Sequence, residues 1–566
     1  MYTINNIQVI MFKNNVKHLQ ESLFGFHTTL PKKQQKELLM SEEYKFYELI
    51  FCNIIEEDFA CLYSKTDSRP NAPVNALVSA LILMQKRSYT YEELFRNIGF
   101  NLLTKTALGL KDINDIPFCP ATLFNFQNRL AKHYSLTDEN LLEKAFDNLT
   151  SEQIDELDIK TDIQRTDSFF AASNIRNYSR LQLLVEMLIR LNRILDEDDR
   201  EYFKELLEPY IKKTSEKYIY NLKSADIPHH VDKIADIYYR LFFQLDVKYS
   251  NNPVFKTFQK VYKEHFKVKN EKIIVKKPEE LKSNSLQSPD DIDATYRNKN
   301  GKKSKGQSIN IFETANPDNQ INLITDVSVQ PNNVNDDKIL NERIEKVKEK
   351  TPDIEELHSD AQYGSSDNDE KLEDLQITQV QTAIKGKTAS VEIQIEQVTE
   401  NQYKVSCPYQ TVLSIKSRKR KKAEYDLEIC STCPQSSDCS TIKMKRFRVL
   451  YFTHKDYLKK KRLNSINKIP ENRRYLRNNV EATVCEFTRK MPNKKLKVRG
   501  YFKTTVFAYT VAIAINFGRI FRYIHKNGIQ STQNANIFCF YVKERFLSIF
   551  KIYFFALLKI FQSKFA

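Results

Sequence analysis

The stretch EELHSDAQYGSSDN, residues 355–368, places an aspartate where a predicted strand stops and a loop begins. Leu357 lies near the centre of the strand, Asp360 follows it, and a Ser-Ser-Asp helix start comes after Gly364. Carboxylates at strand ends are common in metal and catalytic sites, because the sheet holds them rigidly while the loop leaves them reachable. They are also common in plain turns, since Asp caps the following helix. Asp360 indicates a metal or catalytic site only if other residues of the chain can join it there.

Strands and helices alternate on both sides of this stretch. Leu157, Ile159 and Ile163 alternate through DELDIKTDIQRTDSFF, which predicts a strand ending at Thr166-Asp167-Ser168. The pattern then predicts helices from 181 to about 266, strands in 308–315, 321–329 and 378–386, and a helix over 336–350. This order predicts a mixed α/β multidomain protein, with a layered core built on a mixed sheet and interrupted by a helical insertion.

The N-terminal part is predicted to be all-α. VNALVSALILMQ is apolar all round and predicts a buried helix, and Thr90 and Glu93 have capping-box spacing. Such short helices fit a helix-turn-helix-like DNA-binding unit as well as ordinary helix packing. The predicted domains are a helical segment 1–66, the DNA-binding unit 67–150, the core 151–180, 286–386 and 471–525, the helical insertion with its linker 181–285, a basic insertion 387–470 and a tail 526–566.

Composition excludes several classes of protein. Only 10 of the 566 residues are Gly, and no GxGxxG or Walker A pattern occurs, which argues against nucleotide folds built on glycine-rich loops. Nine irregularly placed Cys fit reduced cytosolic thiols better than a disulfide framework. The N-terminus does not resemble a signal peptide. The apolar run 506–517 is shorter than the ~20 residues a span needs, so no membrane association is expected.

Positive charge is concentrated in one region. The chain carries a formal charge of +16. Residues 411–500, with 25 Lys and Arg against 8 Asp and Glu, carry +17, so the rest of the chain carries −1. Such clustering is typical of a polyanion-binding surface, because each neutralised phosphate releases counterions. A disordered basic tail would be the alternative. Aromatic and apolar residues interleave with the charges here, so a folded surface that binds nucleic acid is favoured.

Three carboxylates could converge. Asp167 and Asp360 are predicted at strand ends, and Glu481 lies on a predicted helix over 473–490, seven residues after Arg474 and four after Arg477. These offsets place the three helix residues on one stripe. Clustered carboxylates need cations, and hard oxygen ligands select Mg²⁺ or Mn²⁺. Individually, Asp360 could be a helix cap, Glu481 an i,i+4 partner of Arg477, and Asp167 a turn residue.

Other carboxylates compete for these roles. Asp162, on the opposite strand face, is the main rival of Asp167, and Asp326, in the middle of a predicted strand, is a weaker rival. An acidic run before ATYRNKNGKKSKG makes that segment either an Asp-rich linker or a loop that positions DNA through basic side chains. The acidic run consists of Asp290, Asp291 and Asp293, and the basic side chains are Arg297, Lys299 and Lys305.

The basic insertion also carries a group of cysteines. Cys430 and Cys433 form a CxxC pair, Cys439 follows, and Cys407 lies upstream in CPYQ. Four thiolates could hold a structural Zn²⁺ that orders the insertion. The spacing is irregular, with no CxxC at Cys407, so unliganded thiols remain the alternative.

Several stretches together resemble a known family. They are RPNAPVNALVSALILMQKRSYTYEELFRNIG, RTDSFFAASNIRNYSRLQLL, DDIDATYRNKNGKKSKGQSINIFETANPDNQINLITDVSVQPNNVNDD, LHSDAQYG and RNNVEATVCEFTRKMPNKKLKVRGYFKTTVFAYTVAIAINFGRIFR. In this order they resemble the DDE transposases of bacterial insertion sequences, over about residues 68–130 and 155–525. Residues 526–566 match nothing in that pattern.

The resemblance implies a ribonuclease H-like core in which Asp167, Asp360 and Glu481 are the DDE triad. It implies a divalent metal, Mg²⁺ or Mn²⁺, that serves cleavage at transposon ends and joining to a target. It further implies a homodimer on DNA in the bacterial cytoplasm, associated with the nucleoid, and it aligns Tyr363 with the tyrosine that follows the second aspartate. The expected DNA contacts near the glutamate are Arg474, Arg477, Lys490 and Arg499.

Two other functions fit the same residues. A metal-dependent DNA nuclease without strand transfer would carry the same triad. A catalytically dead, transposase-derived protein would bind the same DNA without cutting it.

Overall fold

The computed structural model describes residues 12–20, 22, 25–64, 70–220, 222–270, 272–299, 301–381, 391–399, 401–417 and 420–528, apart from the side chains of 465–468, 472 and 474. The described residues fall into two compact units. The first contains described residues up to 141, residues 317–323 and described residues from 513 onward; the second contains 142–316 and 324–512. The tail beyond 528 and the side chain of Arg474, both included in the predictions above, lie outside the described residues.

The first unit is helical, as predicted. Its α4 (Val74–Arg87) is buried along most of its length, which explains the absence of a polar face in its sequence. The Thr90–Glu93 capping box is confirmed at the start of α5 (Tyr91–Phe100). The other helices are α1 (Phe26–Thr29), α2 (Lys32–Leu39), α3 (Glu42–Leu49), α6 (Leu102–Ala107) and α7 (Pro120–Thr137).

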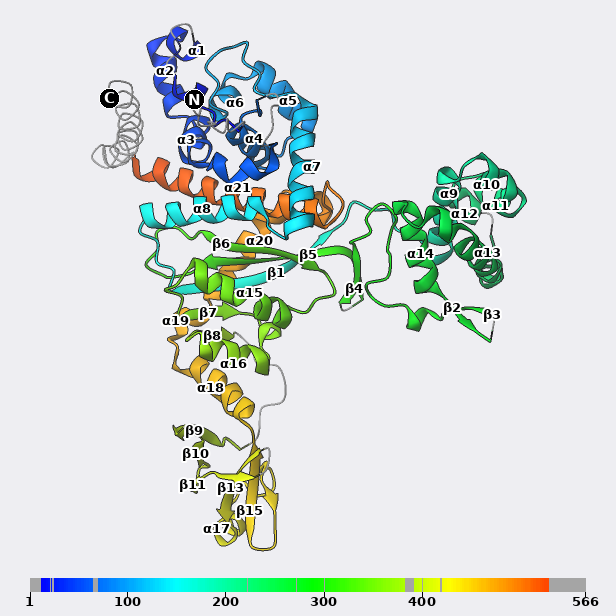
Figure 1. Ribbon diagram of the computed structural model, residues 1–566. Coiled ribbons are helices and arrows are strands. Elements are labelled where there is room, and N and C mark those ends of the chain that lie inside the picture. The colour runs from blue at the N-terminus through cyan, green and yellow to red at the C-terminus, as the bar shows by residue number, and fades with distance from the viewer. Residues whose placement is uncertain are drawn as a thin grey trace, which may run out of the picture. The chain divides into compact units, whose positions relative to one another are not determined.

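A six-stranded mixed sheet forms the centre of the second unit (Figure 1). The long β5 pairs antiparallel with β1 along one edge, and with β4 and then β6 along its length. Beyond β1, β7 and then β8 are added in parallel. The strands are β1 (Ile163–Ala172), β4 (Thr295–Lys299), β5 (Lys302–Thr314), β6 (Ile324–Pro331), β7 (Glu356–Ser359) and β8 (Thr378–Gln381).

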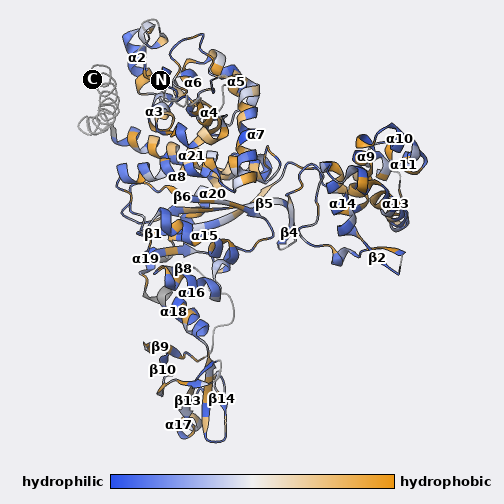
Figure 2. Ribbon diagram, in the orientation of Figure 1, coloured by the Kyte–Doolittle hydropathy of each residue, from blue (hydrophilic) through white to orange (hydrophobic). Residues whose placement is uncertain are grey.

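Apolar side chains cover both faces of this sheet. On one face, Phe312 and Leu357 pack with α15 (Asp336–Lys350) and α16 (Ser366–Asp374). On the other, Phe169 contacts Phe487 of α20 (Val480–Thr488), with ring centroids 5.4 Å apart. Figure 2 shows the hydrophobic colour along the central strands. The predicted mixed α/β core is therefore confirmed, and α15 has the predicted bounds.

The first strand was wrongly placed at both ends. Leu157 follows α8 (Leu141–Glu156), and its amide donates to Gln153, so the apolar alternation from Leu157 to Ile159 belongs to a turn. The strand then runs on to Ala172, paired with β5. Asp167 consequently lies within β1 rather than at its end.

Helices occupy the first insertion, as predicted for 181 to about 266. They bury an apolar core of their own, which is why the segment reads as strongly amphipathic. A hairpin of β2 (Phe266–Lys269) and β3 (Lys272–Val275), not predicted, precedes the linker. The helices are α9 (Arg180–Ile194), α10 (Glu197–Tyr202), α11 (Lys204–Ile211), α12 (Ser215–Tyr220), α13 (Ile227–Tyr249) and α14 (Pro253–His265).

The basic insertion is a folded β-rich region. A cluster of nine buried hydrophobic residues in it includes Phe452, Tyr457 and Leu458, so apolar residues between the charges form a core, which agrees with the predicted folded surface. The β-strands themselves were not predicted. One sheet contains β9 (Gln394–Thr399), β10 (Gln402–Ser406) and β11 (Thr411–Leu413); the other contains β12 (Ile415–Ser417), β13 (Arg420–Asp426), β14 (Ile442–Lys443) and β15 (Phe447–Phe452); the helices are α17 (Leu427–Thr432) and α18 (His454–Lys468).

The helix α21 (Tyr501–Gly528) extends beyond the apolar run 506–517 at both ends. Its residues Tyr501–Asn527 are long and apolar enough to cross a bilayer by length and composition alone, yet 89% of the most apolar window is buried inside the protein. That burial is the pattern of a core helix.

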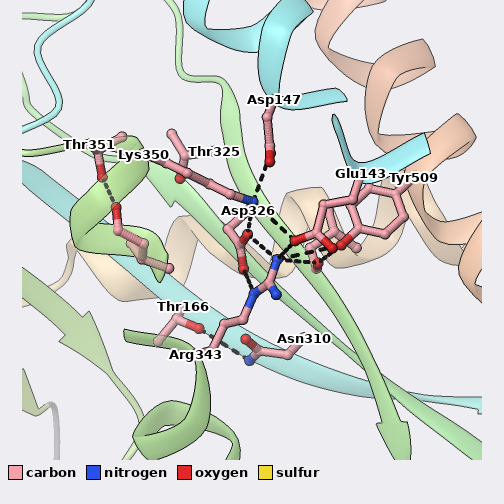
Figure 3. A network of polar contacts seen from close by, with 12 residues as sticks. Glu143, Asp147, Thr166, Asn310, Thr325, Asp326, Arg343, Lys350, Thr351 and Tyr509 are labelled. Atoms are coloured by element: carbon pink, nitrogen blue, oxygen red, sulfur yellow. Dashed lines mark hydrogen bonds and ion pairs between the residues drawn. The ribbon is translucent and has the colours of Figure 1, made fainter. Parts of the chain in front are cut away.

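A buried ion network joins α15 to β6 and α8 (Figure 3). The fully buried Asp326 carboxylate accepts from Arg343 Nε at 2.6 Å and Nη2 at 2.7 Å, and from Lys350 Nζ at 2.7 Å. Lys350 also pairs with Asp147 at 2.7 Å, and Arg343 with Glu143. Burial alone would raise the pKa of Asp326, but Arg343 and Lys350 hold it below its ordinary value. Asp326 is therefore a structural charge.

Replacing Arg343 with Met should destabilise the sheet by about 3–5 kcal/mol, because it leaves the Asp326 carboxylate buried with one cation removed. Hydrogen exchange of the β6 amides measures the free energy of local opening. Lys346→Met, at an exposed position of the same helix, is the matched control and should leave exchange unchanged. Equal exchange in the two variants would contradict the assignment of this network as a structural clamp.

Candidate functional site

Two predicted acidic residues are brought together by strand pairing. In the parallel pair, Gln164 lies opposite Leu357 and Arg165 opposite His358. Continuing this register by two residues puts Asp167 beside Asp360, and neighbouring strands lie about 4.8 Å apart. Residues in register on parallel strands also share a face of the sheet. The two carboxylates therefore start from adjacent positions on one face.

Asp360 lies directly after β7, where the sequence predicted it. It caps the short 3₁₀ turn Ala361–Tyr363, and its Oδ1 accepts from the Ala361 amide at 2.6 Å. Tyr363 is fully buried, and its hydroxyl accepts from Asn310 Nδ2 at 2.7 Å. That amide also donates to the carbonyl of Asp167 at 3.1 Å. The residues that follow Asp360 thus fix its loop against the strand that carries Asp167.

The predicted helix over 473–490 is wrong in its first half. The segment consists of α19 (Glu471–Arg474), a 3₁₀ turn η7 (Leu476–Asn479) and α20, so Arg474 and Glu481 share no helical stripe. Arg473 is instead drawn to the sheet, where its Nη2 lies 2.6 Å from Glu356 Oε2. Arg477 and Glu481 still face each other across one turn, with Nη2 and Oε1 3.6 Å apart.

Arg477 links the glutamate segment to the first aspartate. Its Nη2 lies 2.9 Å from Asp167 Oδ2, so one guanidinium faces both acids. Burial raises the pKa of Asp167 to about 6; Arg477 opposes this shift, while the negative charges of Glu481 and Asp336 add to it. Glu481 is therefore close enough for its charge to act on Asp167, and together with Asp360 these two residues make up the acidic cluster.

A second buried link seats α20 on the sheet. Glu313 of β5 is fully buried, and its Oε1 accepts from Arg165 Nε at 2.7 Å. Its Oε2 accepts from Thr483 Oγ1 at 2.6 Å. Arg165 Nη1 also donates to the Leu476 carbonyl at 3.1 Å. Glu313 thereby fixes the segment that presents Glu481, a role that sequence reasoning missed because its partners are 148 and 170 residues away.

Asp336 is an acidic residue near the cluster that sequence reasoning also missed. It is 7% exposed at the start of α15, and its Oδ1 accepts from Ser168 Oγ at 2.5 Å. Ser168 directly follows Asp167, so Asp336 holds β1 at the position of the first acid. The Asp-Asp pair at the start of a predicted helix was a visible signal, but it also reads as an ordinary helix N-terminus.

A polar cavity of about 580 Å³ lies beside Asp336 and the loop that follows Asp360. Gln362 and Gly364 line it from the Asp360 loop, and Asp336 lines it from α15. Lys299 Nζ also lines it and lies 3.3 Å from Gln362 Oε1. The cavity is therefore a polar space next to the loop that carries Asp360.

The basic residues predicted to contact DNA differ in their surroundings. Arg297 donates to the carbonyls of Asn332 and Val334 at 3.1 Å and lies over the Phe170 ring, so its guanidinium is engaged within the protein. Lys305 is half-buried, which lowers its pKa. Arg499 Nε donates to the carbonyl of Asn174 at 2.5 Å. Lys490 is half-buried two residues beyond α20.

The rival carboxylates are all engaged elsewhere. Asp162 precedes β1, five residues or about 16 Å of strand from Asp167, and both its carboxylate oxygens accept from Asn316. Asp326 belongs to the ion network. The acidic run ties the linker to the rest of the second unit: Asp290 pairs with Arg190, Asp291 accepts from Ser173, and Asp293 accepts from the Tyr501 amide.

The acidic cluster has the donor chemistry of a divalent-metal site. Within the described part of the chain, no three His, Cys, Asp or Glu side chains already stand in position to hold a metal ion. The cluster nevertheless fits a hard cation, since its donors are carboxylate oxygens. Glu481, with a side chain 63% exposed, has room to turn toward the aspartates.

Residues 400–521 match the family model of the transposase DDE domain. The match includes Glu481 and the four cysteines of the basic insertion, and it lies outside Asp167 and Asp360. It supports the predicted resemblance to DDE transposases. A search of curated proteins found no match. A search of solved structures found none either.

Replacing Glu313 with Gln should loosen the segment that presents Glu481, because a hydrogen bond to a charged group contributes about 1.5–3 kcal/mol. We expect amide exchange across α20 to rise by at least about tenfold, the equivalent of 1.4 kcal/mol. The β6 amides should exchange as before. Unchanged exchange in α20 would show that Glu313 does not position this helix.

Proposed function

We propose that this chain, which resembles DDE transposases and matches the transposase DDE domain over residues 400–521, cuts and joins DNA at the ends of an insertion sequence. The proposal rests on Arg477, whose guanidinium faces both Asp167 and Glu481, and on the β1–β7 register, which puts Asp360 beside Asp167 when it is continued by two residues. The reaction is metal-dependent hydrolysis and transesterification of phosphodiesters.

The strand order supports a ribonuclease H-like core. Three antiparallel strands, β6, β5 and β1, are followed across the sheet by the parallel strands β7 and β8. Among these five strands taken in chain order, the proposed first acid lies on the first strand, β1, and the second lies directly after the fourth, β7. The third lies on a helix after the fifth, β8. This distribution corresponds to the triad that the resemblance implies.

Asp167, Asp360 and Glu481 would hold Mg²⁺ or Mn²⁺. When bound, such ions activate a water or a 3′-hydroxyl and stabilise the leaving oxygen of a phosphodiester. The chain's own contribution is to hold the carboxylates in place. Arg477 compensates Asp167 and Glu481, and the Tyr363–Asn310 contact fixes the Asp360 loop against β1.

Double-stranded DNA is the proposed substrate. Residues 411–500, which include Glu481, carry a net charge of +17. The β-rich fold of the basic insertion gives these charges an ordered surface, on which phosphate contacts position the duplex without reading its sequence. Cytoplasmic action on DNA and a homodimer that pairs two transposon ends complete the proposal.

Substitution of the triad tests the assignment. Asp167→Asn, Asp360→Asn and Glu481→Gln should each lower Mg²⁺-dependent cleavage by about 10²–10³-fold or more, the range for losing a group that stabilises developing charge. DNA affinity should persist. The substrate is a pair of DNA ends carrying the inverted repeats that flank the coding sequence, and the assay follows both cleavage and joining.

Asp162→Asn is the matched control for this series and should retain cleavage. Full activity of Asp167→Asn together with an inactive Asp162→Asn would overturn the assignment of the first acid. Cleavage without joining by the unmodified chain would favour the nuclease, and binding without Mg²⁺-dependent nicking would favour the catalytically dead alternative.

Neutralising the basic run 418–422, Arg418, Lys419, Arg420, Lys421 and Lys422, to Gln should weaken binding to every DNA sequence alike. The slope of log affinity against log salt should become shallower by about 0.9 for each phosphate that the variant no longer neutralises. Arg418 and Lys419 lie outside the described residues. Neutralising Lys212 and Lys213 of the helical insertion is the control. An unchanged slope would show that the run is merely solvated.

A further inference from the structure

Four cysteines from three segments line one small cavity in the basic insertion. Cys407 follows β10, Cys430 lies in α17, Cys433 ends that helix, and Cys439 precedes β14. The cavity measures about 20 Å³, room for a single ion or water molecule. All four are free thiols. The fold therefore gathers the four residues, although the irregular spacing had left this open.

Hydrogen bonds already converge on two of these sulfurs. The Gln410 amide donates to Cys407 Sγ at 3.3 Å, and the Gln410 side-chain Nε2 donates to Cys430 Sγ at 3.3 Å. Gln410 is itself held by the Asp426 amide, which donates to its Oε1 at 2.8 Å. Donors aimed at sulfur stabilise the thiolate form, which is the form that binds metal.

A neighbouring basic side chain also holds the cysteine-bearing loop in place. Arg448 further fixes the loop between the cysteines, since its Nη1 donates to Ser436 Oγ at 2.6 Å. Several thiolates here would repel one another unless a cation lay among them.

The apolar core around the cavity is small. Its core cluster contains nine buried residues, and Cys407, Cys430 and Cys439 pack against that cluster as partly buried side chains. Small domains with cores of this size commonly depend on a disulfide or a structural metal. A tetrahedral four-thiolate zinc site would join β10, α17 and the loop before β14 at one point.

We propose that Cys407, Cys430, Cys433 and Cys439 bind one structural Zn²⁺ that orders the basic insertion. Within the described residues the sulfurs are not yet in metal-holding positions, so binding draws them inward to about 2.3 Å from the ion. The thiol protons pass to solvent, and no oxidant or reductant takes part. This site is independent of the proposed transposase activity.

The test begins with the full-length protein purified from zinc-supplemented cells, whose zinc content is measured by elemental analysis. We expect about one zinc per chain, the stoichiometry of a closed four-ligand site. The four cysteines should resist alkylation, as mapped by mass spectrometry, and become reactive after chelation. Co²⁺ in place of zinc should give thiolate charge-transfer absorption.

Variants locate the ion. Cys430→Ser with Cys433→Ser should lower zinc affinity at least tenfold, while the exposed Cys119→Ser should not change it. Asp167→Asn with Asp360→Asn should retain the zinc, which separates this site from the acidic cluster. A wild-type chain without stoichiometric zinc, alkylation of all four cysteines regardless of chelator, or a disulfide among them would overturn the proposal, and none of these outcomes requires a variant to fold.

Discussion

The parallel pairing of β1 with β7 is the constraint on which the acidic cluster depends. It places Asp167 and Asp360, 193 positions apart in the sequence, at neighbouring points on one face. A slip of one residue in this register would turn one of the two carboxylates to the opposite face. Antiparallel pairing of β1 with β5 along its whole length makes such a slip costly, because β5 is also held by β6.

Buried charges on both faces of the sheet reinforce this register. On the α20 face, the charge of Glu313 is compensated by Arg165, and its carboxylate accepts a hydrogen bond from Thr483. On the α15 face, Asp326 is compensated by Arg343 and Lys350. Buried pairs of this kind contribute little net stability but penalise arrangements that separate the partners. They specify where the helices lie, and the position of Glu481 follows from that.

Local signals were sufficient for part of this architecture. The strand before Asp360 and the helix over 336–350 could be predicted because apolar periodicity and flanking turn residues agree there. The break before α20 could not be predicted, because Arg473 is drawn to Glu356, a partner 117 residues away. The part played by Glu313 was invisible for the same reason, and the pair Asp336 and Asp337 resembled an ordinary helix N-terminus. The strand was predicted to begin too early because Leu157 and Ile159, which lie in and just after a turn, have the same period-two alternation as a strand.

Anomalous diffraction from crystals of the full chain soaked in Mn²⁺ tests the central claim most directly, since it locates the metal without assuming a reaction. The account predicts a manganese peak within about 2.2 Å of carboxylate oxygens from both Asp167 and Asp360, close to the distance for hard divalent cations, with Glu481 turned toward it. A peak at Asp336 and Asp337 without Asp167, or no ordered manganese beside β1 and β7 at saturating concentration, would contradict it.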